Sequence, residues 1–320
     1  MTAIETHDWQ DADVLRALEI YSADRLACFG VNHLNATRLE PWDKQFLREL
    51  KKALEIPKLT QDLRVRIIGA INLHYWNAGL CGAVYLVVQA AEVLYRNALS
   101  SAIGRHFGSP EWLLKPPKEM YTTGLLTDKD RKMILKARDA AYDKYYNLVR
   151  SPKYEPHHAD VLAELDFGFW ATLADTHPDG KASDSEKKRD ELWARMIRRV
   201  IPKATREQRN RKQLIDWLTN AREVRNAVAH QHPIWASADE LGLFEICRQK
   251  HTGGDKLVIL FMRERRRLIY ELINAIDERC GAITLHYDQF ENALQALATV
   301  SKPGTVPPER SKPAGSTAIG

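Results

Sequence analysis

The segment EVRNAVAHQHPIW, residues 223–235, holds side chains suited to acid–base and phosphate chemistry within eight positions. His230 and His232 carry imidazoles, whose ordinary pKa of about 6.5 allows them to move protons near neutral pH. Arg225 carries a permanent positive charge on a planar fork of donors that matches phosphate oxygens. Together these groups suit metal-independent RNA cleavage, in which the neighbouring 2′-OH attacks and a doubly charged phosphorane must be stabilised.

The helical run that ends in this segment must position these residues. On a helical wheel Arg225 falls within the apolar stripe, an unusual place for arginine. Asn226 and His230 are i, i+4 neighbours on the adjoining flank, where the amide could fix the imidazole tautomer. Pro233 predicts that the helix ends at about His230 or Gln231. Arg225 and His230 diverge by about 140° on one helix, so two copies related by a twofold axis could form a composite cleft.

A second polar group interrupts the most apolar part of the chain, residues 83–104. This segment is apolar on nearly every face and is predicted to be the central core helix. Glu92 and Arg96 are spaced as an i, i+4 ion pair, and Asn97 lies beside them. Buried charges require further partners, because a buried charge without one is costly. Such a cluster either specifies the fold or serves a function.

A purely structural interpretation accounts for the same residues. Arg225 could be a buried anchor for a carboxylate such as Glu92, and His230 could cap the helix end. The bare Arg-x4-His spacing is expected about once by chance in a chain of this composition. Residue types and spacing leave both interpretations open.

Helical periodicity dominates the chain and alternating β-branched runs are nearly absent, which predicts an all-α protein. We expect a single helical domain over residues 1–300 and a disordered, proline-rich tail over 301–320. The longest predicted helix should break near Gly69 or Gly79. The predicted helices cover residues 11–26, 41–54, 60–104, 128–149, 158–176, 185–200, 206–230 and 256–299.

The sequence indicates a cytoplasmic protein without a membrane segment. The first residues lack the basic and apolar regions of an export signal, and the apolar run 83–88 is too short to span a bilayer. The four cysteines are far apart and suggest neither a disulfide framework nor a zinc site. The loop EPHHAD, with His157, His158 and Asp160, is a weak candidate for a metal site. We expect no cofactor and no metal.

The net charge of +5 is mild, but its distribution is uneven. Residues 181–212 hold twelve Lys or Arg against five acidic residues, and Arg263–Arg267 reads RERRR. Such clusters suit a phosphate backbone if they fold onto one side of the protein, and otherwise are solvated helix faces.

Four ordered segments, spread over residues 20–236, resemble the Abi-like (abortive infection) proteins, a bacterial branch of the HEPN superfamily. Their counterparts in that family are an LS-x-x-RL opening, a YxWN run with an E-V-x-x-RN helix, an ELxFGFW element and a closing RNR-x-x-HHEPI region. The segments here are YSADRLACF (21–29), HYWNAGLCGAVYLVVQAAEVLYRNALSSAIGRHFG (74–108), LAELDFGFWATL (162–173), and LWARMIRRVIP (192–202) followed by VRNAVAHQHPIW (224–235).

The resemblance implies an all-helical HEPN fold, dimers and, for many members, metal-independent RNase activity through an R-x4-6-H motif. This chain departs from the family where His230, Gln231 and His232 replace the usual His-His-Glu before the proline. A role for that glutamate therefore does not carry over. The positions that match are Arg225, Asn226 and His230 as catalytic residues, and Glu92, Arg96 and Asn97 as supporting ones. His232, which is displaced from the family's second histidine, is a further supporting candidate.

From the residues and the resemblance together we expect a homodimeric endoribonuclease that cuts single-stranded RNA and leaves a 2′,3′-cyclic phosphate. The resemblance further implies a growth-arresting toxin in phage defence, with an RNA or protein antitoxin as a partner. One alternative is a non-catalytic RNA-binding HEPN module that binds a small RNA or an antitoxin. Another is a helical scaffold in which Arg225, Glu92 and Arg96 form only a buried ion network.

Overall fold

A computed structural model describes residues 10–29, 44–55, 58–149, 155–175, 184–234, 241–250, 254–277 and 287–295. Every regular element in these ranges is a helix, which confirms the all-α prediction. The predicted proline-rich tail lies outside the described residues.

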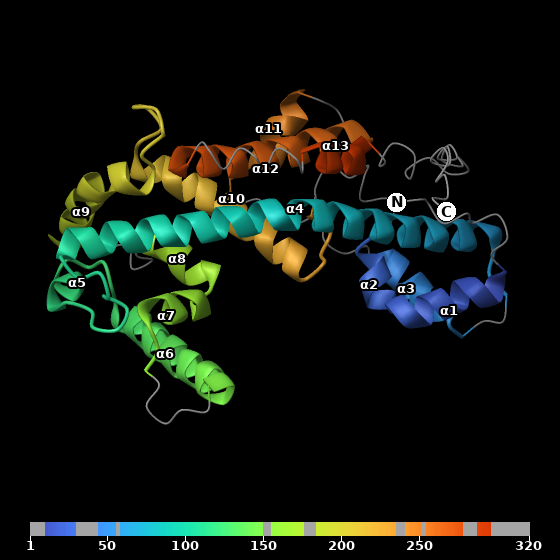
Figure 1. The fold of residues 1–320 in the computed structure, drawn as a ribbon. Helices are drawn as coiled ribbons and strands as arrows, with labels where there is room; N and C mark the ends of the chain where they lie inside the picture. The colour runs from blue at the N-terminus through green and yellow to red at the C-terminus, as the bar shows by residue number, and fades with distance from the viewer. Residues whose placement is uncertain are drawn as a thin grey trace, which may run out of the picture.

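The helix α4, Gln61–Phe107, runs 47 residues and forms the long axis of the molecule (Figure 1). It begins where the Thr60 side chain accepts a hydrogen bond from the backbone N–H of Leu63, and ends at Gly108, whose φ of 62° suits glycine. The predicted break near Gly69 or Gly79 is wrong. A helical glycine costs only about 1 kcal/mol relative to alanine, and the apolar side chains that α4 buries on both sides of these positions offset that cost.

The length of α4 also corrects the expectation that no segment is apolar enough to span a bilayer. By length and composition α4 could do so, since an 18-residue window within it has a mean hydropathy of 1.5. Half of that window is buried inside the fold, and the core helix of a protein that never meets a membrane has the same properties.

Helices from the second half of the chain cover α4 along most of its length. These are α8 (Phe167–Ala174), α9 (Asp184–Val200), α10 (Arg211–Ala229), α12 (Gly254–Ile276) and α13 (Tyr287–Gln295). Figure 1 shows α10 crossing α4 at an angle, and α12 packs against both α10 and α4, with α13 further along α4. This arrangement buries one continuous apolar core that includes Trp112, Trp170, Trp193 and Trp217.

Smaller groups of helices lie at the two ends of α4 (Figure 1). At its N-terminal end are α1 (Asp11–Tyr21), α2 (Ala23–Ala27) and α3 (Lys44–Ala53). At its C-terminal end are α5 (Lys118–Thr122), α6 (Asp128–Val149) and α7 (His158–Glu164). The remaining helix, α11 (Leu243–Lys250), packs on α12.

Several predicted helices are interrupted where a side chain or an unusual backbone angle intervenes. The run 11–26 divides at Ser22, which has a φ of 61° and caps α2 by accepting from Arg25 N–H. The run 158–176 divides because the Asp166 carboxylate caps a new helix, accepting from Phe169 N–H at 2.7 Å. The predicted helix 256–299 is observed as two helices, α12 and α13. The bounds of α6 agree with the predicted helix 128–149. The short helices α5 and α11 were not predicted.

A buried ion pair fixes α10 against α12. Arg265 is fully buried and donates to the Glu223 carboxylate at 3.0 Å. Beside it the Asn220 amide donates to the Arg265 carbonyl at 2.7 Å, and the Trp217 indole donates to Glu271 at 3.0 Å. Because buried polar groups must find partners, these bonds set the rotation of α10 and therefore the direction in which its C-terminal end faces.

Candidate functional site

The HQH segment forms a tight turn that closes α10. The N–H of His232 donates to the Ala227 carbonyl at 2.8 Å, and the N–H of Gln231 donates to the Val228 carbonyl at 3.0 Å. This pair of bonds is the Schellman motif, with His230 as the C-cap. Gln231 has a φ of 49°, the left-handed conformation that glycine adopts most easily. The predicted helix end at His230 or Gln231 is confirmed.

Arg25, from α2, holds the outside of this turn. Its guanidinium donates to the His230 carbonyl at 3.0 Å and to the Gln231 carbonyl at 2.8 Å. A third, longer contact joins the same guanidinium to the Gln231 side-chain oxygen at 3.4 Å. A single charged side chain therefore satisfies two successive carbonyls just beyond the last residue of α10.

Asn77, from α4, holds the inside of the turn. Its amide nitrogen donates to the His232 carbonyl at 3.1 Å, and its amide oxygen accepts from Ile234 N–H at 3.1 Å. Asn77 is only 1% exposed. Both the nitrogen and the oxygen of the Asn77 amide thus bond to the backbone of residues 232–234. These bonds fix the direction in which the chain leaves α10.

The rings of His230 and His232 project from the turn side by side. Their centroids are 5.6 Å apart with an angle of 33° between the planes, and both residues are exposed. Partial burial lowers the pKa of His232, and the positive charges of Arg25 and His230 lower it further. His232 therefore favours the neutral imidazole, the form that accepts a proton.

Arg225 meets Glu92 at the boundary between core and solvent. The Arg225 Nε lies 4.0 Å from a Glu92 carboxylate oxygen, with 34% and 10% of the two side chains exposed. Burial raises the pKa of Glu92, and the attraction of Arg225 and Arg96 opposes the rise without cancelling it. The structure brings Arg225 to Glu92, the contact that the purely structural interpretation of the sequence invokes, although the arginine is more exposed than the apolar stripe predicted.

Two expected side-chain pairs do not form among the described residues. Glu92 and Arg96 make no ion pair within 4.0 Å, and Arg96 acts on Glu92 only through its charge. The Asn226 side chain makes no hydrogen bond to the His230 ring; the backbone carbonyl of Asn226 accepts from His230 N–H at 3.1 Å. His230 has left the helical conformation, with φ −92° and ψ 1°, so its ring no longer continues the helix flank. Asn97 is exposed.

The structure thus forms two clusters from the predicted site residues. One is the turn of His230, Gln231 and His232, and the other is the pair of Arg225 and Glu92. The described interactions within one chain include none between the Arg225 guanidinium and either imidazole.

Arg25 and Asn77 were not predicted as site residues, although both lie in segments that carry the family resemblance. The sequence did contain one signal for Asn77, because it is a polar residue within a largely apolar segment. Their partners lie 205 and 155 residues further along the chain. Local periodicity cannot predict contacts between residues that are so far apart in the sequence.

The EPHHAD segment serves packing and capping. The His158 ring shares a hydrogen bond of 2.9 Å with the Ser100 hydroxyl, and the Asp160 carboxylate accepts from His157 N–H at 2.8 Å. In the part of the chain that the structure describes, no three His, Cys, Asp or Glu side chains are grouped closely enough to hold a metal ion.

The RERRR cluster is engaged in ion pairs. Arg263 and Arg266 both bind Glu291, at 2.6 and 3.0 Å, and Arg267 binds Glu264 at 2.9 Å. Together with the buried pair of Arg265 and Glu223, these contacts neutralise the cluster. The cluster therefore does not form a free basic surface.

Comparison with known proteins adds no further constraint on this site. No protein-family model, no curated protein and no solved structure matches the chain.

Proposed function

We propose that this chain is an Abi-like protein of the HEPN type and a metal-independent endoribonuclease that cuts single-stranded RNA as a homodimer. The observation that carries the proposal is the pair of exposed imidazoles, His230 and His232, 5.6 Å apart on a turn with an anchored backbone. Two imidazoles at this spacing can serve as the base and the acid of one phosphoryl transfer.

In the proposed reaction the neutral His232 removes the proton from the 2′-OH of RNA, and the 2′ oxygen attacks the adjacent phosphorus. The bond from phosphorus to the 5′ oxygen breaks, and a protonated His230 supplies the proton that this leaving oxygen needs. The products are a 2′,3′-cyclic phosphate and a 5′-OH. The lowered pKa of His232 favours its assignment as the base.

Arg225 is assigned to stabilise the charge on the phosphorane. About one third of its side chain is exposed, and its only described ion pair, with Glu92, is a loose one at 4.0 Å. Because Arg225 and the imidazoles make no described contact within one chain, the Arg225 that completes each site comes from the second copy.

The convergence of the four family-like segments supports the HEPN assignment. Arg25 comes from the first segment, Asn77 and Glu92 from the second, and the HQH turn from the fourth. Asp166, from the third, is close enough that its charge contributes to the raised pKa of Glu92. Segments far apart in the chain thus meet around α10, as an assembled site requires.

The test is cleavage of end-labelled single-stranded RNA in EDTA by the wild type and by Arg225→Ala, His230→Ala and His232→Ala. We expect each variant to lose at least about 100-fold in rate, with cyclic-phosphate ends on the wild-type product. His157→Ala, which alters an exposed histidine at the N-cap of α7, is the matched control and should retain activity. Equal cleavage by all the proteins, or none by the wild type, would contradict the proposal.

One alternative is a non-catalytic module that binds a small RNA or an antitoxin, and it is favoured by the departure of His230, Gln231 and His232 from the family's His-His-Glu pattern. This alternative predicts salt-sensitive RNA binding that survives His230→Ala and yields no new ends. The role of a growth-arresting toxin in phage defence rests only on the family resemblance. It predicts that expression arrests growth with the wild type and not with His230→Ala.

A further inference from the structure

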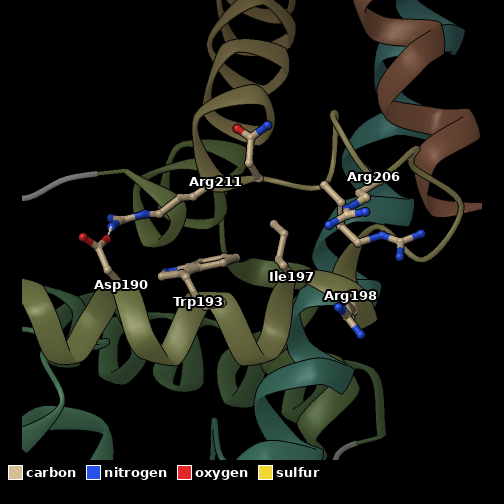
Figure 2. A pocket seen from close by; sticks show the side chains of 9 residues that line it. Asp190, Trp193, Ile197, Arg198, Arg206 and Arg211 are labelled. Carbon is tan, nitrogen blue, oxygen red and sulfur yellow. Dashed lines mark hydrogen bonds and ion pairs between the residues drawn. The ribbon is translucent and has the colours of Figure 1, made fainter.

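A pocket of about 390 Å³ lies at the opposite end of α10 from the HQH turn (Figure 2). Its walls are residues 190–198 of α9, the connecting loop 201–210 and the first residue of α10. The volume is in the range of sites that hold small ligands. The lining residues are Asp190, Trp193, Ala194, Ile197, Arg198, Arg206, Arg209, Asn210 and Arg211.

One stripe of α9 forms the floor of the pocket. Asp190, Ala194 and Arg198 follow i, i+4 spacing, and Trp193 and Ile197 lie between them. The indole N–H of Trp193 is buried and has no hydrogen-bond acceptor in the described part of the chain. A buried donor without an acceptor is uncommon in proteins, and this one belongs to a residue that lines the pocket.

Two of the four lining arginines build the pocket. Arg209 donates to the Pro202 and Ala204 carbonyls, at 2.9 and 2.7 Å, and so holds the loop. Arg211 donates to the Ala174 carbonyl at 2.7 Å and pairs with Asp190. The one carboxylate of the lining is therefore already neutralised by an arginine.

The other two arginines are available to a ligand. Arg198 and Arg206 are exposed and make no hydrogen bond or ion pair with other described residues. Figure 2 shows both on the side of the pocket away from Asp190. The N-terminus of α10, whose cap Asn210 also lines the pocket, adds the positive end of a 19-residue helix.

We propose that this pocket binds a phosphate group, held by Arg198 and Arg206 against the N-terminus of α10. Guanidinium forks and helix N-termini are both complementary to phosphate oxygens. The phosphate can be carried by a small free molecule or by the 5′ end of an RNA strand, because both present the same dianion. At 1.5 Å per residue, the length of α10 places the pocket about 28 Å from the HQH turn, so it is a separate site and does not depend on the nuclease proposal.

The experiment is isothermal titration calorimetry of the full chain with inorganic pyrophosphate and with a short RNA bearing either a 5′-phosphate or a 5′-OH. The RNA is 2′-O-methylated, so that no 2′-OH is present for cleavage. We expect saturable binding of at least one phosphate-bearing probe and about a tenfold or greater loss of affinity in the double variant Arg198→Ala/Arg206→Ala. Arg195→Ala is the matched control, because Arg195 is an exposed arginine of α9 that does not line the pocket. Circular dichroism verifies that each variant is folded.

Tighter binding of 5′-phosphorylated RNA than of pyrophosphate and of 5′-OH RNA identifies a strand end as the ligand. Tighter or equal binding of pyrophosphate identifies a small free phosphate compound. The proposal is overturned if neither phosphate-bearing probe saturates, if a folded double variant binds as tightly as the wild type, or if Arg195→Ala loses as much affinity as the double variant.

Discussion

The guanidinium of Arg25 donates to the backbone carbonyl of His230 at 3.0 Å, across 205 residues of chain. The same guanidinium binds the next carbonyl, that of Gln231, at 2.8 Å. It thus anchors the C-terminal end of α10 to the N-terminal helices, and its charge contributes to the lowered pKa of His232. One side chain therefore supports both the position and the protonation state of the proposed base.

Replacing Arg25 by alanine should weaken the candidate site more than the fold. The hydrogen bonds from Arg25 to the His230 and Gln231 carbonyls are exposed to solvent. We therefore expect a loss of only about 1 kcal/mol in the free energy of unfolding. RNA cleavage should fall at least about tenfold, because the imidazoles lose their fixed position. Urea titration and cleavage rates check both values. Arg48→Ala, in α3, is the control and should retain full cleavage activity. Full cleavage activity in Arg25→Ala would instead show that the turn does not need Arg25 as an anchor.

Replacing Gln231 by glycine should stabilise the protein. The φ of 49° at this position strains any residue with a Cβ, and glycine at this place in a Schellman motif removes the strain. We expect a gain of about 1 kcal/mol, measured as a higher unfolding midpoint in urea. Gln231→Val should have the opposite effect, since β-branched residues tolerate positive φ least. A lower midpoint for the glycine variant than for the valine variant would contradict this account.

Stability should decrease on mild acidification. Burial lowers the pKa of His74, His158 and His232 below the usual 6.5, so the unfolded chain binds more protons than the folded chain as the pH falls. The contribution of these neutral histidines to stability is therefore complete above pH 6.5. It declines as the pH falls through 6.5 toward the lowered pKa values. Thermal unfolding at a series of pH values checks the sign. His232→Asn should reduce the slope, and an unchanged slope would show that His232 does not contribute.

Glu92→Gln separates the functional interpretation of the second cluster from the structural one. The raised pKa means that the folded chain holds the Glu92 charge at a cost once the pH rises above the usual 4.5. Removing the charge should leave stability at neutral pH unchanged or raise it by up to about 1 kcal/mol. If Glu92 restrains Arg225 in the proposed site, cleavage should change while stability does not. A loss of more than about 2 kcal/mol in urea titration would instead favour the scaffold interpretation.

The sequence alone determined the features that depend on neighbouring residues. Helical periodicity predicted an all-α protein and both ends of α6, and Pro233 predicted the end of α10 near His230. These predictions succeed because a helix is built from hydrogen bonds between residues four apart, so its pattern and its stop signals are local. The break predicted within α4 failed because burial of the whole helix outweighs the weak local preference of glycine.

Tertiary structure alone decided which residues meet. Arg25 and Asn77 reach the HQH turn from α2 and α4, and the arginines around Arg265 are bound in ion pairs. Arg198 and Arg206 join a pocket with the N-terminus of α10 only after the loop between α9 and α10 has folded. These relationships depend on helix packing, which brings together residues that share no local pattern, because close packing and the pairing of buried polar groups are properties of the whole chain.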